Sequence, residues 1–408
     1  MTINNYSRNF FWQNLVHDLP GRTDYIFFAK IGFKTKQPKW LLSGWAISIF
    51  YIFILVYGIN ILAIHRNPAY MASYLTFIIV VSIVIGIIYE KNTFCRYVCP
   101  VGHLLGIYSR ISMWGWRVKN PTICTDCSDK SCIQKKYRYS LNNKSCGVNL
   151  YPAKIEDNSH CILCAGCLKT CNNYQNKNTY GRPNPGFIKV GFSNGLLNAK
   201  PMIVAEWFFL FIVSGFVIYE IFSEFNSAKS VLLFLPNFIN TTLLISNAAV
   251  KSLLKSIYLF FFLPAIFWFL PFLIIKISKE TLSIKDYVLY YGLVFIPIVA
   301  AAHLSKAILK TTSRIPYFKY IINDYKGIET AKAIVAKNIS LQAIPLWSEW
   351  IITIAITTIL LIGYYIGLKM IDKIDNKLLS TKGGIIMKLP VTLYFLLFFI
   401  EVIIWRWF

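Results

Sequence analysis

Long apolar segments separated by polar links dominate the chain outside one central polar region. Several of them reach or exceed the roughly 18 residues that a helix needs to cross a bilayer. The pattern predicts spanning helices at 41–63, 69–89, 203–222, 257–275, 287–302, 346–370 and 389–405. The stretch 228–248 is also apolar, but Pro236, Asn237 and Asn240 interrupt it, which favours a re-entrant or interfacial segment over an eighth span.

This arrangement predicts an all-α integral membrane bundle of about seven transmembrane helices with one polar insert. Four regions follow: a cytoplasmic N-terminal arm (1–40), a transmembrane hairpin (41–89), a cytoplasmic insert (90–200) and a transmembrane helical domain (201–408). Composition agrees, because the 408 residues are 56% hydrophobic and only 15% charged, whereas soluble domains are about 25% charged. The lipid bilayer is therefore the first expected partner.

The chain carries a formal net charge of +24, with 16 Lys and Arg against five Asp and Glu in the insert. Excess cations in a membrane protein mark cytoplasmic loops and contacts with anionic headgroups. No nucleic-acid-binding fold or basic helix is evident, so we expect no nucleic-acid partner. The charges predict a multi-pass protein of the cell inner membrane, with the insert on the cytoplasmic side. They do not decide between seven and eight spans.

Ten cysteines lie in the insert, and eight of them have the spacing of iron–sulfur ligands. Residues 161–171 contain the run C-x2-C-x2-C-x3-C, in which the fourth cysteine binds the other cluster of a two-cluster ferredoxin. The spacing predicts two [4Fe–4S] clusters in a ferredoxin-like domain. The first set of ligands is Cys124, Cys127, Cys132 and Cys171, and the second is Cys161, Cys164, Cys167 and Cys146. Structural zinc and disulfides are the alternatives, although zinc sites usually stop at four ligands and disulfides need an oxidising compartment.

The other two cysteines, Cys95 and Cys99, stand in the sequence FCRYVCPVG just after the second predicted span. A C-x3-C spacing places both thiols on one face of a helix, and Pro100 then marks a break. Two small buried residues would be the plain explanation. The functional explanations are a thiol–disulfide pair, a soft copper site or another redox centre.

The chain resembles the NapH/NosR/CcoG-type membrane polyferredoxins in the order of its features. Transmembrane helices come first, C-x3-C-P follows at a membrane edge, and a two-cluster insert comes next. The stretch 94–171 carries the resemblance. It implies an insert that passes electrons between the quinone pool or a cytoplasmic donor and a partner oxidoreductase, or, as in CcoG-type members, copper reduction for oxidase assembly. The chain departs from the family in having one C-x3-C-P motif rather than two, and Asn172 rather than proline after Cys171.

Ionisable residues within predicted spans are costly and are candidates for function. His303, at the end of one span, and Glu206, at the start of another, are the candidates for a quinone or proton site. Glu220, Glu349 and Glu401 are weaker ones, because interfacial side chains often reach the headgroups. His160 precedes Cys161 and is expected to tune that cluster by hydrogen bonding.

The leading hypothesis is an electron-transfer subunit that relays electrons through two [4Fe–4S] clusters to or from a redox partner, rather than a stand-alone catalyst. The second is a copper reductase or assembly factor that uses Cys95 and Cys99. The third is a non-redox protein with structural zinc. Sequence does not identify the donor, the acceptor or the direction of electron flow.

Overall fold

The structure is a computed structural model of the whole chain. It describes residues 33, 35–64, 67–89, 93–118, 121–128, 130–134, 145–146, 148, 150–161, 163–164, 166–169, 171, 186–190, 194–223, 226–277, 282–324, 326–339, 346–378 and 381–407. This part is mostly helical, which confirms a helical membrane bundle; the predicted span 41–63 is not among its long apolar helices, and the ferredoxin-like domain stays a prediction. Six of its helices are long and apolar enough to cross a membrane: Pro68–Ile88, Val204–Phe222, Ala248–Ile277, Ile284–Tyr320, Ser348–Ile374 and Ile386–Ile404. A shorter apolar helix covers Trp45–Ile61.

The chain forms two compact units. The first contains Met1–Leu210 and Ala248–Ser256, and the second contains Phe211–Asn247 and Ile257–Phe408. The division falls within α12 (Val204–Phe222), which is one continuous helix. Every residue of the predicted cluster sites belongs to the first unit.

In the first unit, α3 (Lys39–Leu42), α4 (Trp45–Phe53) and the π-helix η1 (Ile54–Ile61) precede α5 (Pro68–Ile88). Gly44 adopts a left-handed conformation (φ 82°), and a Cβ there would lie 3.2 Å from the Cβ of Ala205. The small residue therefore allows the start of α4 to approach the start of α12. The Ser48 hydroxyl donates to the Ala205 carbonyl at 3.2 Å, and Tyr51 packs against Phe209 at a ring distance of 4.9 Å.

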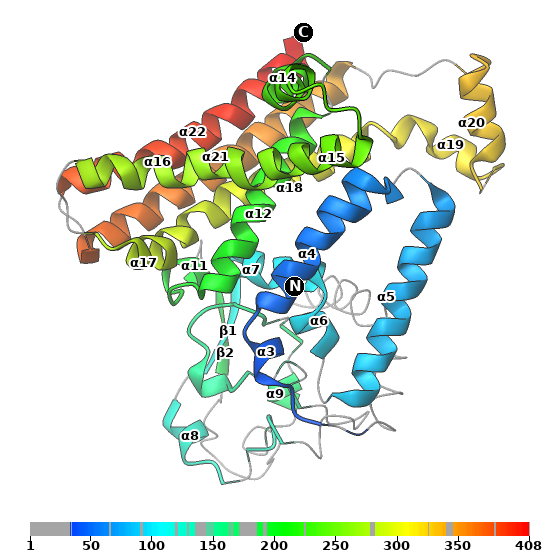
Figure 1. Cartoon of the computed structure of the whole chain (residues 1–408). Helices are drawn as coiled ribbons and strands as arrows, with labels where there is room; N and C mark the ends of the chain where they lie inside the picture. Colours follow the sequence, from blue (N-terminus) through cyan, green and yellow to red (C-terminus); the bar gives the residue numbers. More distant parts are fainter. Residues whose placement is uncertain are drawn as a thin grey trace. The chain divides into compact units, whose positions relative to one another are not determined.

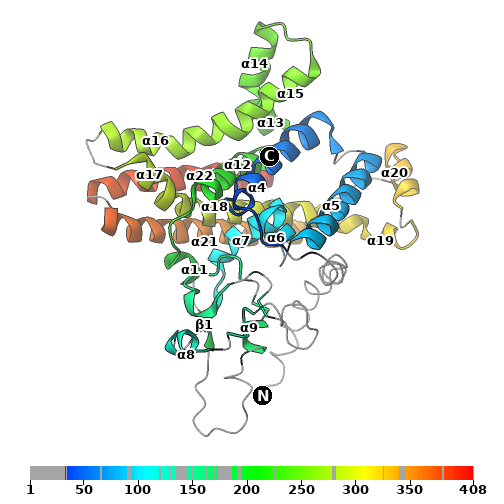
Figure 2. The same cartoon turned by 60° about the horizontal axis from the view of Figure 1, so that its bottom comes forward.

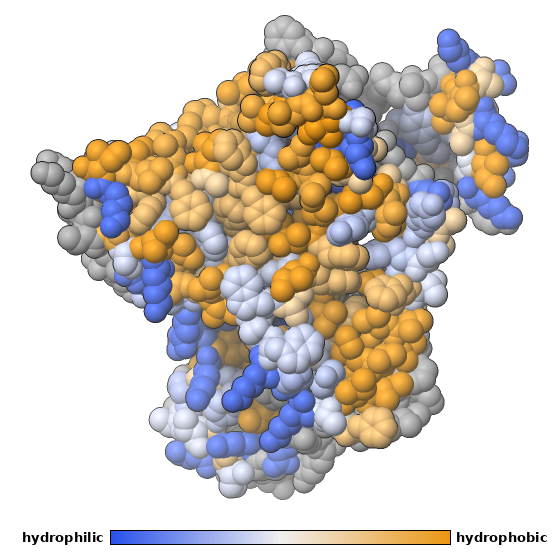
Figure 3. Space-filling model, in the orientation of Figure 1, coloured by the Kyte–Doolittle hydropathy of each residue, from blue (hydrophilic) through white to orange (hydrophobic). Residues whose placement is uncertain are grey.

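Helix α5 is apolar all round, and backbone hydrogen bonds attach its C-terminal end to the rest of the first unit. The Asn67 side chain accepts hydrogen bonds from the first backbone N–H groups, and Pro68 occupies the first position. At the other end, the N–H groups of Phe33 and Thr35 donate to the carbonyls of Ile87 and Ile88. Only 6% of its spanning window is buried inside the protein, and its apolar side chains form a broad exposed surface (Figure 3).

The described part of the insert contains short elements. They are α6 (Thr93–Tyr97), α7 (Pro100–Tyr108), the 3-10 helix η3 (Ser109–Ile111), β1 (Trp114–Val118), α8 (Pro121–Thr125), the 3-10 helix η5 (Pro152–Lys154), α9 (Gly166–Lys169), β2 (Gly186–Val190) and α11 (Asn194–Leu197). Strands β1 and β2 pair antiparallel, with Trp114 opposite Val190. The side chain of Asn158 donates to the Trp114 carbonyl at 2.9 Å, which attaches the cysteine-bearing loop to β1.

The second unit is a helical bundle. After α12 come α13 (Asn226–Leu232) and α14 (Phe234–Thr242); α15 (Ala248–Ile257) lies almost wholly in the first unit. The remaining elements are η6 (Tyr258–Phe262), α16 (Leu263–Ile277), α17 (Ile284–Asp286), η7 (Tyr287–Tyr291), α18 (Gly292–Thr312), η8 (Ile315–Tyr317), α19 (Phe318–Ile321), α20 (Ile328–Val335), α21 (Leu346–Leu378) and α22 (Thr381–Trp407). Helices α18, α21 and α22 pack side by side (Figure 1 and Figure 2).

Aromatic side chains fill the core of this bundle. Trp268 stacks on Phe295 with ring centroids 3.9 Å apart, and its indole N–H donates to Ser214 at 3.1 Å. Tyr394 packs edge-on against Phe295 at 5.7 Å. Since all four residues are almost fully buried, they hold α12, α16, α18 and α22 together mainly by apolar burial.

The ambiguous segment 228–248 is not one helix in the structure. Its residues divide between the short helices α13 and α14 and the start of α15, and many of its large apolar side chains are exposed, including Val231, Phe234 and Leu244. It is therefore not among the helices long enough to span. The predicted span 257–275 in turn proves to be the second part of a longer helix, Ala248–Ile277.

Candidate metal centre

All ten cysteines lie in the described part of the chain, and none of them forms a disulfide. The eight predicted cluster ligands are half-buried. Cys124 lies in α8 and Cys167 in α9, and the other six lie outside helices and strands.

The thiols of the first predicted set are electrostatic neighbours. Burial, followed by the nearby thiols of Cys124, Cys171 and Cys127, raises the pKa of Cys132 to about 12. Burial and the thiols of Cys171 and Cys127 also raise the pKa of Cys124. The backbone N–H of Lys130 donates to Cys127 Sγ at 3.4 Å, and Lys130 is left-handed (φ 42°). The fold thus brings Cys171, distant in sequence, to the loop of the other three.

The second set behaves in the same way. Burial, then the thiols of Cys146 and Cys164, raises the pKa of Cys167, and burial raises that of Cys161. The N–H of Leu150 donates to Cys146 Sγ at 3.3 Å.

The two sets are also neighbours of each other. The backbone N–H of Cys146 donates to the Cys132 carbonyl at 2.8 Å, and the Cys132 thiol is near enough to Cys167 to raise its pKa. One cysteine of each predicted set is therefore joined to one of the other set by a backbone hydrogen bond.

Thiolates in sets of four are the donors that iron–sulfur clusters take. Buried thiols that raise one another's pKa are stable as thiolates only when cations lie among them. Within the described residues, no group of three His, Cys, Asp or Glu side chains is arranged to hold a single metal ion. The four cysteines of a four-iron cluster lie further apart than the ligands of a single metal ion, because each cysteine binds a different iron. Bound clusters would supply one-electron redox chemistry, and the backbone N–H···S bonds would help to set their potentials.

Cys95 and Cys99 are separated by the end of a helix. Cys95 lies in α6 and is exposed, whereas Cys99 is a half-buried, extended residue immediately before α7. Pro100 begins α7, as its fixed φ favours. Because the helix ends between them, the two thiols do not lie on one helical face.

Four ionisable side chains, which we call the buried ionic cluster, gather beside the second set: His103, Arg110, His160 and Glu206. Arg110 Nη2 lies 3.0 Å from Glu206 Oε2, and His160 Nε2 lies 3.7 Å from Glu206 Oε1. The side chains of Arg110 and Glu206 are 6% and 10% exposed. Glu206 was a sequence candidate, but His103 and Arg110 were not, since contacts between residues 96 positions apart leave no local signal.

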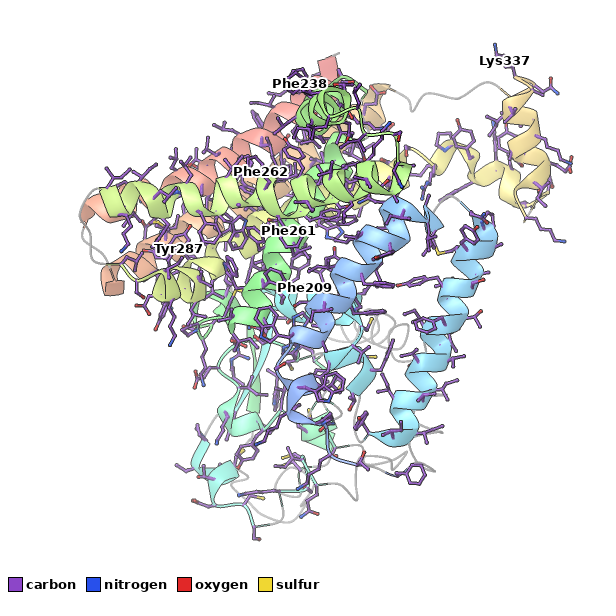
Figure 4. The ribbon with its side chains drawn as sticks, viewed as in Figure 1. Phe209, Phe238, Phe261, Phe262, Tyr287 and Lys337 are labelled. Atoms are coloured by element: carbon purple, nitrogen blue, oxygen red, sulfur yellow. The ribbon has the colours of Figure 1, made fainter. Side chains whose placement is uncertain are left out.

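His103 is the least satisfied member of this cluster. Its ring is 6.0 Å from that of His160 and meets Phe209 edge-on at 4.8 Å; Phe209 is marked in Figure 4. Burial lowers the pKa of His103 to about 4 against the opposing effect of the Glu206 carboxylate. Neither ring nitrogen has a hydrogen-bond partner among the described residues.

The other sequence candidates lie in the second unit. His303 is half-buried on α18, near the Glu220 carboxylate and the Lys306 ammonium group. Lys306 and Lys310 lie 3.7 and 3.4 Å from Glu220 Oε2. His303 thus belongs to an ion-paired group on α12 and α18.

Two further glutamates differ in their surroundings. Glu349 is half-buried at the start of α21. Glu401 on α22 is 2% exposed, and neither of its carboxylate oxygens has a hydrogen-bond partner within the described residues.

Comparison with known proteins gives one distant relative of uncharacterised function. An uncharacterised protein of the archaeon Methanocaldococcus jannaschii is 27% identical over 121 residues, which cover 30% of this chain and 43% of that protein. The chain thus matches less than half of the length of this relative. No family model matches the chain, and no solved structure matches it.

Proposed function

We propose that the protein is a membrane-bound electron-transfer protein that holds two [4Fe–4S] clusters. Electrons would pass singly through the clusters between a quinone-pool or cytoplasmic donor and a partner oxidoreductase. The protein would carry electrons for chemistry that the partner performs. We place it in the inner membrane with the clusters on the cytoplasmic side, because the insert is strongly basic.

The observation that carries this proposal is the grouping of the thiols. The neighbours that act on Cys132 are the other members of its set, Cys124, Cys127 and Cys171. Those that act most strongly on Cys167 are the other members of the second set, Cys146, Cys164 and Cys161. A single zinc site offers no reason for eight thiols in two adjoining sets of four.

The test is to purify the protein anaerobically, measure iron and acid-labile sulfide, and record low-temperature EPR spectra after reduction. We expect about eight irons per chain and the signal of two interacting reduced clusters. Zinc without such a signal would refute the proposal.

Single substitutions then test the assignment of ligands. Cys171→Ala should disturb the first cluster and Cys146→Ala the second, each with the loss of about four irons. Cys95→Ala is the matched control and should keep about eight. A full iron content in both ligand variants would show that the sets are wrong.

A further inference from the structure

The loop that delivers Cys161 is attached to η3 by hydrogen bonds. The carbonyl of Asn158 accepts from the N–H of Cys161 at 3.1 Å and from the Ser109 hydroxyl at 2.7 Å. One residue further on, Arg110 Nε donates to Ser159 Oγ at 2.6 Å. Ser109 and Arg110 therefore hold the backbone that immediately precedes the cluster ligand.

The same arginine connects this loop to a membrane helix. Its Nη2 group binds Glu206, which lies in the first turn of α12, and the second carboxylate oxygen of Glu206 faces His160. A carboxylate is favoured at this position because the N-terminal end of a helix is electropositive. Glu206 thus contacts both the loop residue next to Cys161 and the arginine that holds the loop.

We propose that the Glu206–Arg110 pair positions the Cys161 loop and sets the reduction potential of the cluster bound by Cys161, Cys164, Cys167 and Cys146. This inference rests on the proposed function, because it requires that cluster to be present. Through this pair, the charge state at the start of a membrane helix controls how readily the cluster accepts an electron. Glu206 and Arg110 act on the cluster as positioning residues and not as ligands.

The sign of the effect follows from the charges. Each reduction step adds one negative charge to the cluster, so a nearby carboxylate opposes reduction and a nearby guanidinium favours it. Both side chains are buried, so solvent screens them only weakly. Their effects nearly cancel while they are paired, and removal of either one leaves the other uncompensated.

The test is an EPR-monitored redox titration of the full-length protein and two variants. Glu206→Gln should raise the midpoint potential of one cluster, and Arg110→Gln should lower the potential of the same cluster. Each change should amount to about a tenfold shift of the one-electron equilibrium, or about 59 mV. The double variant should return towards the wild-type value.

Glu220→Gln is the matched control, since Glu220 is the ion-paired glutamate at the other end of the same helix. It should leave both potentials unchanged. A merely structural role for the pair predicts shifts of the same sign in both single variants, or none, and either result would overturn the inference.

Cluster content separates the possible failures. Wild-type protein without an iron–sulfur signal would refute the proposed function itself. If the wild-type protein contains two clusters and neither variant changes their midpoint potentials, this inference alone is refuted. If Glu206→Gln lost its iron, Arg110→Gln would still test the inference, because only the electrostatic role predicts a lowered midpoint potential of the cluster in that variant. Glu206→Asp should then restore both the iron content and the wild-type potential.

Discussion

Gly106 in α7 offers a sharp test of how the Cys161 loop is packed. A Cβ at this position would lie 2.5 Å from Nδ1 of His160 and 2.9 Å from its Cε1. The imidazole has little freedom to move away, because its Nε2 faces Glu206 and its backbone is already left-handed (φ 59°). The methyl group of Gly106→Ala would therefore displace the residue next to Cys161.

The expected magnitude follows from two opposing effects. Replacing glycine by alanine within a helix normally stabilises a protein by about 1 kcal/mol, whereas overpacking a filled site costs about 1–3 kcal/mol. The clash should outweigh the gain in helix propensity, so that Gly106→Ala lowers the free energy of unfolding by up to about 2 kcal/mol. It should also reduce the iron bound by the second set of cysteines.

The assay is thermal unfolding in detergent, followed by tryptophan fluorescence, together with iron content. Gly58→Ala is the matched control, because its new methyl group would meet only the flexible Cδ1 end of Ile64, at 3.2 Å, and the Cγ2 methyl group of Ile54, at 3.7 Å. We expect Gly58→Ala to be neutral or stabilising. Equal stability and equal iron in the two variants would refute the packing described for His160.

Three further predictions concern burial and charge. The pKa of His103 is lowered to about 4 in the folded protein, so between about pH 6.5 and pH 4 this imidazole is protonated only in the unfolded chain. The free energy of unfolding should therefore fall by up to about 3 kcal/mol over that range. Acid unfolding of His103→Gln should lack this part of the pH dependence. Lys306→Met should destabilise the second unit by about 1–3 kcal/mol in denaturant titrations. The substitution removes one of the two ammonium groups that lie within 3.7 Å of Glu220, and Lys310 is the other. An unchanged unfolding midpoint would contradict this prediction. Gly102→Ala should be more harmful than Gly106→Ala, since its Cβ would collide with the backbone carbonyl of Cys95; comparable melting temperatures would count against that order.

The membrane helices could be predicted from sequence because their signal is local. An apolar stretch of 21 residues is sufficient to identify Pro68–Ile88, and Asn67 and Pro68 mark its start. The ends of helices were less predictable: α18, which contains His303, continues to Thr312, well beyond the predicted end at residue 302. Lysines with long aliphatic stems extend a helix past its apolar part without breaking it.

The two sets of cysteines were also assigned from their spacing, and both the ligand sets and the bound clusters stay predictions. The contacts of the buried ionic cluster could not be read in this way. Arg110 lies in a basic region, where one more positive charge does not indicate a special role. Its partner Glu206 follows 96 residues later. Such a pair becomes visible only when η3 and the start of α12 are placed together by the fold. His103 is similar, because only its burial distinguishes it from an ordinary surface histidine.

The arrangement of α5 makes the bilayer a structural component of the first unit. At about 1.5 Å per residue, its 21 residues extend about 31 Å, which matches the hydrocarbon core of a typical membrane. Since only 6% of its spanning window is buried inside the protein, we expect lipid chains to cover most of its length. Membrane thickness therefore acts on its tilt, and α5 in turn connects, through Ile87 and Ile88, to the polypeptide that leads into α4. A thinner or thicker membrane would change the tilt of this helix first.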